Sequence, residues 1–442
     1  MHSEIREFSM AGGGFTRVQA VTFDRWEDLC FFSPEPNAQT FLQITGLYRD
    51  FIVPSYPWLY AKLAFFRLPE DIAVPEVPGV IAKDPLLRAA LILRKGLHVA
   101  SGTRFSTPEA EHLWHALTAR GCTAIVKGVR PGTVVLPVSE KLGFLAKSQK
   151  DAAFKCNLGF FTMDRLDCMT CWDRLGTPIG LRVKNGAVLQ PPLFRREALF
   201  VQRNGNVHIG VPQLAALKIL IGGRVFEPGK NAELYARPEY FRTPLKKGTE
   251  LVIVNGSVLA VCEKGGTPVP SSGFVLRSPA AKGILPGTHV EYAGMEDLLF
   301  AVQVGNSAVA DGVPVRGFRS RFWNIKRPFG PPTPPSLYPL DYKADRAPRM
   351  ALGADAGGNP SVLFFEGRPK FGDDPELHSR GASLMEVADL SASFGLTECI
   401  NLDGGGSAQI LLNGRRALCV SDRDPNDLSE RERAVPEGLC VI

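Results

Sequence analysis

Three consecutive glycines stand near the C-terminal end of the chain, directly after an acidic residue. Residues 401–413 read NLDGGGSAQILLN; Asp403 precedes the glycine triplet and Ser407 follows it. The three glycines are Gly404, Gly405 and Gly406. Glycine loses the most backbone entropy on ordering, so a glycine run between two apolar segments indicates a backbone that must approach another group closely. Successive glycine amides can form an anion-binding nest, with Asp403 and Ser407 beside it.

The same residues also fit a glycine-rich β-turn in which Asp403 caps its own backbone. A nucleotide-binding P-loop is excluded, because no lysine follows the glycines. Residue types alone therefore leave two interpretations open, a plain turn and a ligand site.

The segment 401–413 resembles the signature of the phosphodiester glycosidase family, and shorter matches follow in the family's order. Residues 157–161 (NLGFF) resemble the family's Asn-Gly-Gly-Phe-Phe, and residues 346–353 (RAPRMALG) resemble its arginine-rich strand. Residues 366–368 (EGR) resemble Asp-Gly-Arg, and residues 432–433 resemble a terminal Glu-Arg pair. The resemblance extends from about residue 150 to the C-terminus.

This resemblance implies a hydrolase that cleaves a sugar from a sugar-1-phosphodiester or a related glycoside. A sugar phosphodiester or other carbohydrate is then the expected partner, and no cofactor is expected. Because the departing phosphate is already a stable anion, stabilising charge matters more than protonating the leaving oxygen. Asp403 is the expected catalytic carboxylate, as nucleophile or as base for water, with Glu432 as a second carboxylate.

The resemblance also implies a phosphate site built from arginines and the glycine triplet. Guanidinium groups bind phosphate oxygens through paired hydrogen bonds, and Asn157 would orient a sugar hydroxyl. The expected substrate-binding residues are Asn157, Arg349, Arg368, Arg433, Gly404, Gly405, Gly406 and Ser407. For each arginine, a surface position or a pair with a carboxylate is the competing interpretation.

Two positions depart from the family pattern. Leu158 replaces a glycine, which puts in doubt the close approach to a ligand that glycine allows, and Glu366 replaces an aspartate. Leu158 favours an alternative function, a non-catalytic protein on the same fold that binds carbohydrate or a cell-envelope polymer. A structural component that makes its contacts through the first 150 residues is a third interpretation.

The sequence does not indicate a metal site. Cys168 and Cys171 form a single Cys-x-x-Cys unit, and His112 and His115 lie three residues apart. Zinc needs about four ligands, and neither group has further ligands at a suitable spacing.

We expect an α+β fold with mainly antiparallel sheets, a few packed helices, and an N-terminal extension that contains helices. Capping residues, prolines at the first turn and terminal glycines predict N-terminal helices over residues 84–96 and 107–121. Asn-Gly dipeptides between short β-rich runs predict hairpins at residues 185–186, 204–205 and 255–256.

The segment that leads to the glycine triplet has the clearest element signals. Ser383 and Glu386 form a capping box, and Gly395 ends the predicted helix. Strands are predicted before this helix at residues 350–354 and 361–365, and after it at residues 398–402 and 409–412. Asp403 should therefore follow a strand directly.

Length, net charge and cysteine count limit the number of domains and the classes of protein that remain possible. The 442 residues suffice for two or three domains; we divide them into an N-terminal region of unknown role, residues 1–149, and a phosphodiester glycosidase-like domain, residues 150–442. The net charge of +6 is too dilute to indicate nucleic-acid binding. The nine cysteines do not suggest a disulfide framework.

No apolar run approaches the roughly 18 residues that a membrane span needs, and the N-terminus lacks the apolar core of a secretory signal. A cytoplasmic location is the default expectation, although the resembled family usually works outside the cytosol. The oligomeric state cannot be predicted from these patterns.

Overall fold

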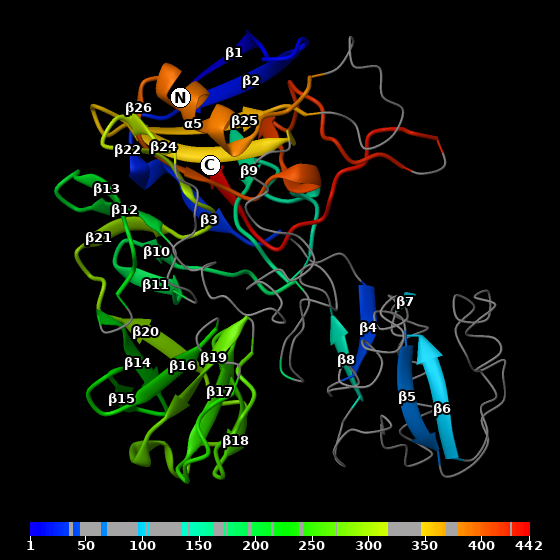
Figure 1. The fold of residues 1–442 in the computed structure, drawn as a ribbon, viewed down its shortest axis with the longest axis vertical. Helices are drawn as coiled ribbons and strands as arrows, with labels where there is room; N and C mark the ends of the chain where they lie inside the picture. Colours follow the sequence, from blue (N-terminus) through cyan, green and yellow to red (C-terminus); the bar gives the residue numbers. More distant parts are fainter. Residues whose placement is uncertain are drawn as a thin grey trace. The chain divides into compact units, whose positions relative to one another are not determined.

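The computed structural model divides the chain into two units, and its ribbon is drawn in Figure 1. Unit 1 comprises residues 1–35, 142–161 and 177–442, and unit 2 comprises residues 36–141 and 162–176. The structure describes residues 1–34, 39–44, 63–68, 96–101, 105–106, 135–139, 142–162, 172, 176–192, 197–213, 216–237, 240, 242–270, 272–316, 346–367, 379–424 and 427–442.

A seven-stranded antiparallel sheet forms the centre of unit 1. In spatial order its strands are β1 (His2–Ser9), β2 (Phe15–Thr22), β25 (Pro360–Phe365), β24 (Arg349–Asp355), β26 (Leu396–Asn401), β22 (Ser307–Ala310) and β23 (Val313–Pro314). The N-terminal hairpin thus pairs with a strand far along the sequence, with Val21 opposite Val362. The first residues of the chain are part of the sheet that leads to the glycine triplet.

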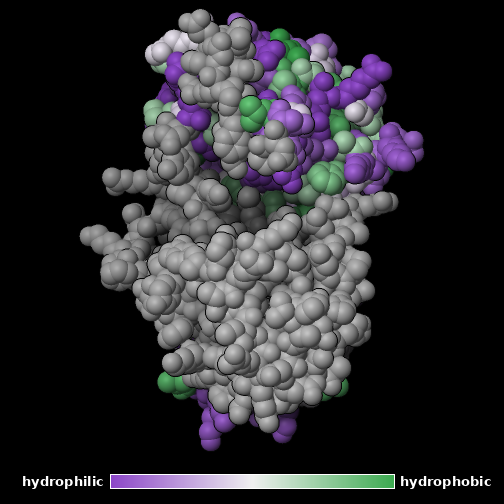
Figure 2. Space-filling view, turned by 90° about the vertical axis from the view of Figure 1, so that its right-hand side faces the viewer, coloured by the Kyte–Doolittle hydropathy of each residue, from purple (hydrophilic) through white to green (hydrophobic). Residues whose placement is uncertain are grey.

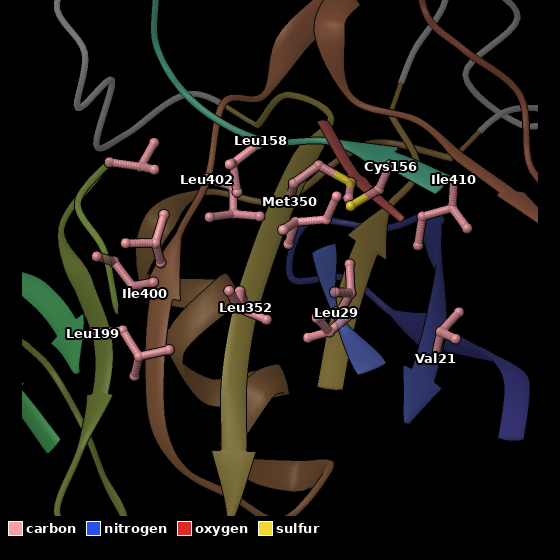
Figure 3. Close-up of a cluster of buried hydrophobic side chains, with 14 of the residues drawn as sticks. Val21, Leu29, Cys156, Leu158, Leu199, Met350, Leu352, Ile400, Leu402 and Ile410 are labelled. Carbon is pink, nitrogen blue, oxygen red and sulfur yellow. The ribbon is translucent and has the colours of Figure 1, made fainter. Parts of the chain in front are cut away.

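Both faces of the central strands β25, β24 and β26 are buried, because their residues alternate between two hydrophobic cores. In β24, Met350 and Leu352 point into one core and Ala351 into the other. The second core is closed by helix α5 (Leu384–Ser393), which contributes Leu384 and Val387. The first core, shown in Figure 3, gathers side chains from several sheets of unit 1.

A four-stranded antiparallel sheet packs against the first core and brings distant segments beside the glycine triplet. Its order is β27 (Ile410–Leu412), β9 (Phe154–Asn157), β28 (Gly438–Val441) and β3 (Cys30–Phe32). Asn157 lies opposite Gly438, and Cys156 lies opposite Ile410. The sheet therefore joins the beginning, the middle and the end of the chain.

Three further antiparallel sheets of unit 1 surround a third core, with Leu181, Ile219 and Leu251 among its members. The five-stranded sheet runs β11 (Ala187–Gln190), β10 (Arg182–Lys184), β21 (Leu298–Val302), β12 (Ala198–Gln202) and β13 (Val207–Gly210). The three-stranded sheet runs β15 (Arg224–Phe226), β14 (Lys218–Ile221) and β20 (Val290–Ala293). The second four-stranded sheet runs β16 (Glu233–Ala236), β19 (Gly273–Arg277), β17 (Glu250–Val254) and β18 (Ser257–Cys262).

The described part of unit 2 consists of short strands. One sheet runs β7 (Phe105–Ser106), β4 (Gln39–Ile44) and β8 (Val135–Ser139), and the other pairs β5 (Leu63–Leu68) with β6 (Gly96–Ser101). These pairs are also antiparallel.

Short 3₁₀ turns complete the described elements. They are η1 (Trp26–Asp28), η3 (Leu145–Lys147), η5 (Pro279–Ala281) and η6 (Gly405–Ser407).

The predicted local signals near the glycine triplet are confirmed. Helix α5 has the capping box of Ser383 and Glu386, and Gly395 follows it with φ +83°. Asn-Gly pairs connect β10 to β11 and β17 to β18, and Asn204-Gly205 lies in the turn between β12 and β13.

The predicted α+β class, with several packed helices and helices in the N-terminal extension, is wrong. Among the described residues α5 is the one α-helix, and the described elements before residue 142 are strands apart from η1. Residues 84–95 and 107–121 lie outside the described residues, while Gly96, the predicted end of a helix, begins β6. Local capping signals cannot reveal strands such as β3, whose partner β28 lies about 400 residues further along the chain, which is why the expectation overstated helix.

Several other expectations fall on residues outside the described ranges. They concern Arg368, His112, His115, Cys168 and Cys171. In the part of the chain that is described, no helix is long and apolar enough to cross a membrane. Hydrophilic residues predominate among the coloured atoms of the face in Figure 2, with hydrophobic ones scattered between them.

Candidate active site

The glycine loop, residues 403–409, is held at both ends by one asparagine. Asn157, the last residue of β9, donates from Nδ2 to the Asp403 carbonyl over 2.7 Å and accepts at Oδ1 from the Gln409 amide over 3.1 Å. The Asp403 amide in turn donates to the Leu158 carbonyl over 3.0 Å. Asn157 is buried, so its observed contacts fix the loop in place.

Two of the three glycines are required by close packing. A Cβ on Gly404 would lie 2.7 Å from the Pro348 carbonyl oxygen, and one on Gly406 would overlap Asp422 Oδ1 and Arg433 Nη2. Gly405 has φ +59°, and its amide donates to the Pro348 carbonyl over 2.8 Å. The triplet thus forms a packed turn, and the Gly405 amide already has an acceptor.

Two of the three predicted arginines, Arg433 and Arg349, lie at this turn with protein partners. Arg433 makes a two-pronged ion pair with Asp422, at 2.9 Å from Nε and 3.1 Å from Nη2. Arg349, the first residue of β24, is buried near Gly404 and donates from Nε to the Ala382 carbonyl over 3.1 Å. Arg433 and Arg349 therefore both lie against the glycine loop.

The Asp403 carboxyl group is buried at the start of this loop, with 8% of the residue exposed. Burial raises the pKa of Asp403 to about 7, because the charged form loses its hydration. The neighbouring Ser407 hydroxyl, the Arg433 charge and the Gly404 amide act in the opposite direction, and Glu437 adds to the rise. Such a carboxyl group can exchange a proton near neutral pH.

Four of the twelve buried side-chain polar atoms that lack a hydrogen-bond partner among the described residues lie on or beside the loop. They are Asn401 Oδ1, Asp403 Oδ2, Ser407 Oγ and Gln409 Nε2. Buried polar groups in native proteins almost always have hydrogen-bond partners, so a concentration of exceptions needs an explanation. Acceptors and donors in one place match the hydroxyl groups of a sugar better than a purely hydrophobic ligand.

A buried ion pair beside Asp403 was not predicted. Arg182 and Glu437 form this pair, and a Cβ on Gly159 would overlap atoms of both side chains. Gly159 follows Leu158, whose carbonyl holds Asp403, and Glu437 precedes Gly438, the partner of Asn157 in the sheet. Arg182 lies in β10 and Glu437 directly before β28, 255 residues further along the chain, so spacing along the sequence offered no signal for the pair.

Leu158 faces away from the glycine turn, into the hydrophobic core. Its side chain is fully buried in the first core, and Figure 3 shows it next to Leu402. The residue that other side chains approach closely is the next one, Gly159, where a Cβ would overlap Arg182 and Glu437. The replacement of glycine by Leu158 therefore does not obstruct the site.

The predicted second carboxylate has other partners. Glu432 Oε1 accepts from the Ala146 amide over 3.0 Å, and Oε2 lies 2.8 Å from Arg416. Arg416 also donates to Gln409 Oε1 over 3.3 Å, which connects Glu432 to the far end of the glycine loop. A catalytic role for Glu432 stays a prediction.

The Glu366 carboxylate is held by hydrogen bonds from three other parts of the fold. Its carboxylate binds Arg17 over 2.7 Å, the Cys419 amide over 2.9 Å and the Ser379 hydroxyl. It thereby joins β2, β25 and the C-terminal segment. No group of three or more potential metal ligands occurs among the described residues.

A sequence model of the phosphodiester glycosidase family matches residues 215–442, which include the whole glycine loop. The chain therefore belongs to the phosphodiester glycosidase family. It is similar to N-acetylglucosamine-1-phosphodiester α-N-acetylglucosaminidase from Homo sapiens, 36% identical over 93 residues, and from Bos taurus, 33% identical over 93 residues. Each match covers 21% of this chain and 16% of the relative.

A solved structure of a hypothetical protein from Synechocystis is similar at a TM-score of 0.43 and 16% identity, covering 99% of this chain and 61% of that one.

Proposed function

We propose that this protein hydrolyses a sugar-1-phosphodiester at the anomeric carbon of the sugar, with Asp403 as the reacting carboxylate. The observation that carries the proposal is the Asp403 carboxyl group itself, buried, unpartnered at Oδ2 and with a pKa raised to about 7. Membership of the phosphodiester glycosidase family supports the glycosidase class of reaction.

In the proposed reaction, water attacks the anomeric carbon while the bond from that carbon to the phosphate oxygen breaks. The phosphate leaves with the bonding electron pair, and Asp403 takes the proton of the attacking water or stabilises the cationic sugar. Protonation of the leaving oxygen is not demanded, because a phosphate ester is a stable anion. One well-placed carboxylate can therefore carry the chemistry.

We assign the phosphate contact to Arg433 and Arg349. Arg433 lies against Gly406 and its charge bears on the Asp403 pKa, and Arg349 lies near Gly404. Guanidinium groups at this turn would offset the charge of the departing phosphate. The proposed contacts for the sugar are the Ser407 hydroxyl, which neighbours the Asp403 carboxyl group, and Gln409 Nε2, which has no partner.

The proposal is tested by screening sugar-1-phosphodiesters with the wild type and the Asp403→Asn variant. The variant keeps the shape of the side chain and loses its charge, so turnover should fall about 100-fold or more while folding is retained. A matched control is Asp355→Asn, which changes a carboxylate in the turn between β24 and β25 and should leave turnover unchanged. Asp403→Asn turnover within about threefold of wild type would remove Asp403 from the mechanism.

The alternative, carbohydrate binding without catalysis, loses the argument that Leu158 supplied, because that side chain packs in the core. The same screen separates the two functions. Tight binding of a sugar phosphodiester by the wild type, with no hydrolysis, would favour the binding protein over the enzyme.

A further inference from the structure

Two cysteines from opposite ends of the chain face each other in the sheet of β27, β9, β28 and β3. Cys30 begins β3, Cys440 lies in β28, and the two residues are directly opposite in the antiparallel register. Directly opposite residues share one face of a sheet, with Cα atoms about 4.5–5.5 Å apart. This separation lies within the range of about 4.4–6.8 Å over which disulfides form.

Both cysteines are free thiols in the structure. Cys440 is buried, whereas Cys30 is partly exposed and so within reach of a small oxidant. Burial raises the pKa of the Cys440 thiol to about 11, and the neighbouring Cys30 thiol contributes to this rise.

A buried lysine stands on the other side of Cys440. Lys155 of β9 lies directly opposite Cys440, so its side chain emerges on the same face, and its charge lowers the Cys440 pKa. The Lys155 ammonium is anchored to the Ser148 carbonyl at 2.7 Å. This positive charge offsets only part of the rise in the Cys440 pKa that burial causes, and disulfide exchange proceeds through the fraction of the thiol that is ionised.

We propose that Cys30 and Cys440 form a disulfide when the protein meets a low-molecular-weight disulfide such as oxidised glutathione. The Cys30 thiolate attacks one sulfur of the oxidant, forming a mixed disulfide and releasing one glutathione thiolate. The Cys440 thiolate then attacks the Cys30 sulfur and releases the second glutathione. Two protein thiols are oxidised to one disulfide and one glutathione disulfide is reduced to two thiols, and the two protons lost by the protein thiols are taken up, through the solvent, by the two glutathione thiolates.

The disulfide would tie the N-terminal strand β3 to the C-terminal strand β28. Because β28 also pairs with β9, which carries Asn157, the cross-link stabilises the sheet that positions the glycine loop. Cross-links between residues far apart in sequence restrict the unfolded chain most. The oxidised protein should therefore be the more stable form, independently of the proposed enzymatic activity.

The test is a redox titration of the full-length protein with mixtures of reduced and oxidised glutathione. Free thiols are blocked by alkylation, and peptides are mapped by mass spectrometry without reduction. We expect a Cys30–Cys440 peptide in oxidising mixtures, while Cys156, which lies next to Lys155 on the opposite face, stays alkylatable after unfolding. The melting temperature should rise by at least about 3 °C on oxidation.

Two variants complete the test. Cys30→Ser should abolish both the cross-linked peptide and the rise in melting temperature, and Cys156→Ser should preserve both. Peptide mapping of the wild type needs no variant, so a poorly folding variant does not leave the question open. Glutathione retained on Cys30, or Cys440 still alkylated at full oxidation, would overturn the proposal.

Discussion

The Asp403 carboxyl group combines a buried position with an oxygen that has no partner. The residue pattern around it predicted a carboxylate beside a glycine turn, and the structure places it there. Its raised pKa depends on burial and on Glu437, which comes from a segment that the pattern did not connect to it. Residue types can therefore indicate which side chain to propose as the reacting group, but its ionisation depends on neighbours supplied by the fold.

At the residue scale, ionisation of Asp403 should lower the free energy of unfolding as the pH rises. The folded-state pKa of about 7 lies above the value of 3.8 for an unperturbed aspartate, so the folded protein binds the proton more tightly than the unfolded chain. Stability from this group is present at low pH and is lost between about pH 4 and pH 7. In Asp403→Asn this loss is absent.

The melting temperature of Asp403→Asn minus that of the wild type should therefore grow from pH 5 to pH 8. The underlying free-energy difference is on the order of a few kcal/mol. Differential scanning calorimetry at matched ionic strength measures the difference directly, with Asp355→Asn as the control. A difference that stays constant across this pH range would show that the Asp403 pKa is not raised.

At the scale of elements, the site is a turn held between β26, β9 and the start of β24. Capping residues predicted α5, and Asn-Gly dipeptides predicted the hairpins, because those features are encoded by neighbours in sequence. Strands β9 and β28 have four residues each and are almost wholly buried, so they lack the alternation that identifies a strand. Their pairing places Asn157 beside the glycine loop, and no local signal shows it.

Gly406→Ala should disrupt the turn by steric overlap. The added methyl group would meet the Asp422–Arg433 ion pair, so we expect a loss of about 1–3 kcal/mol in unfolding free energy and a fall in turnover. The matched control is Gly210→Ala in β13, where the nearest atoms to a new Cβ lie at an ordinary 3.8 Å. Urea unfolding and steady-state kinetics compare the two, and equal behaviour would mean that close packing does not explain Gly406.

At the scale of the whole molecule, strands from the N-terminal part of the chain pair with strands from its C-terminal part. Residues of β2 such as Val18 and Val21 are fully buried against strands from the C-terminal part, and β3 pairs with β28. The family resemblance begins near residue 150, and a domain boundary between residues 149 and 150 was inferred from it. That boundary stays a prediction. Sequence similarity marks where a family pattern begins, whereas folding units are defined by which strands pair.

A chain of residues 150–442 alone should therefore fail to fold cooperatively, because it lacks β2 and β3 and would expose the cores they cover. A chain without residues 1–9 loses only the exposed edge strand β1 and should still fold. Circular dichroism and thermal melting of the two truncations, compared with the full chain, measure this. A cooperative melt of residues 150–442 near the full-length temperature would contradict the prediction.

In the proposed reaction water attacks the anomeric carbon, so the bond between that carbon and the phosphate oxygen breaks. The bond between this oxygen and phosphorus stays intact. Hydrolysis of a sugar-1-phosphodiester in water enriched in ¹⁸O, analysed by mass spectrometry of both products, tests it most directly. Attack at carbon places the heavy oxygen in the anomeric hydroxyl of the released sugar and leaves the phosphate unlabelled. Label in the phosphate would contradict the account and make the protein a phosphodiesterase.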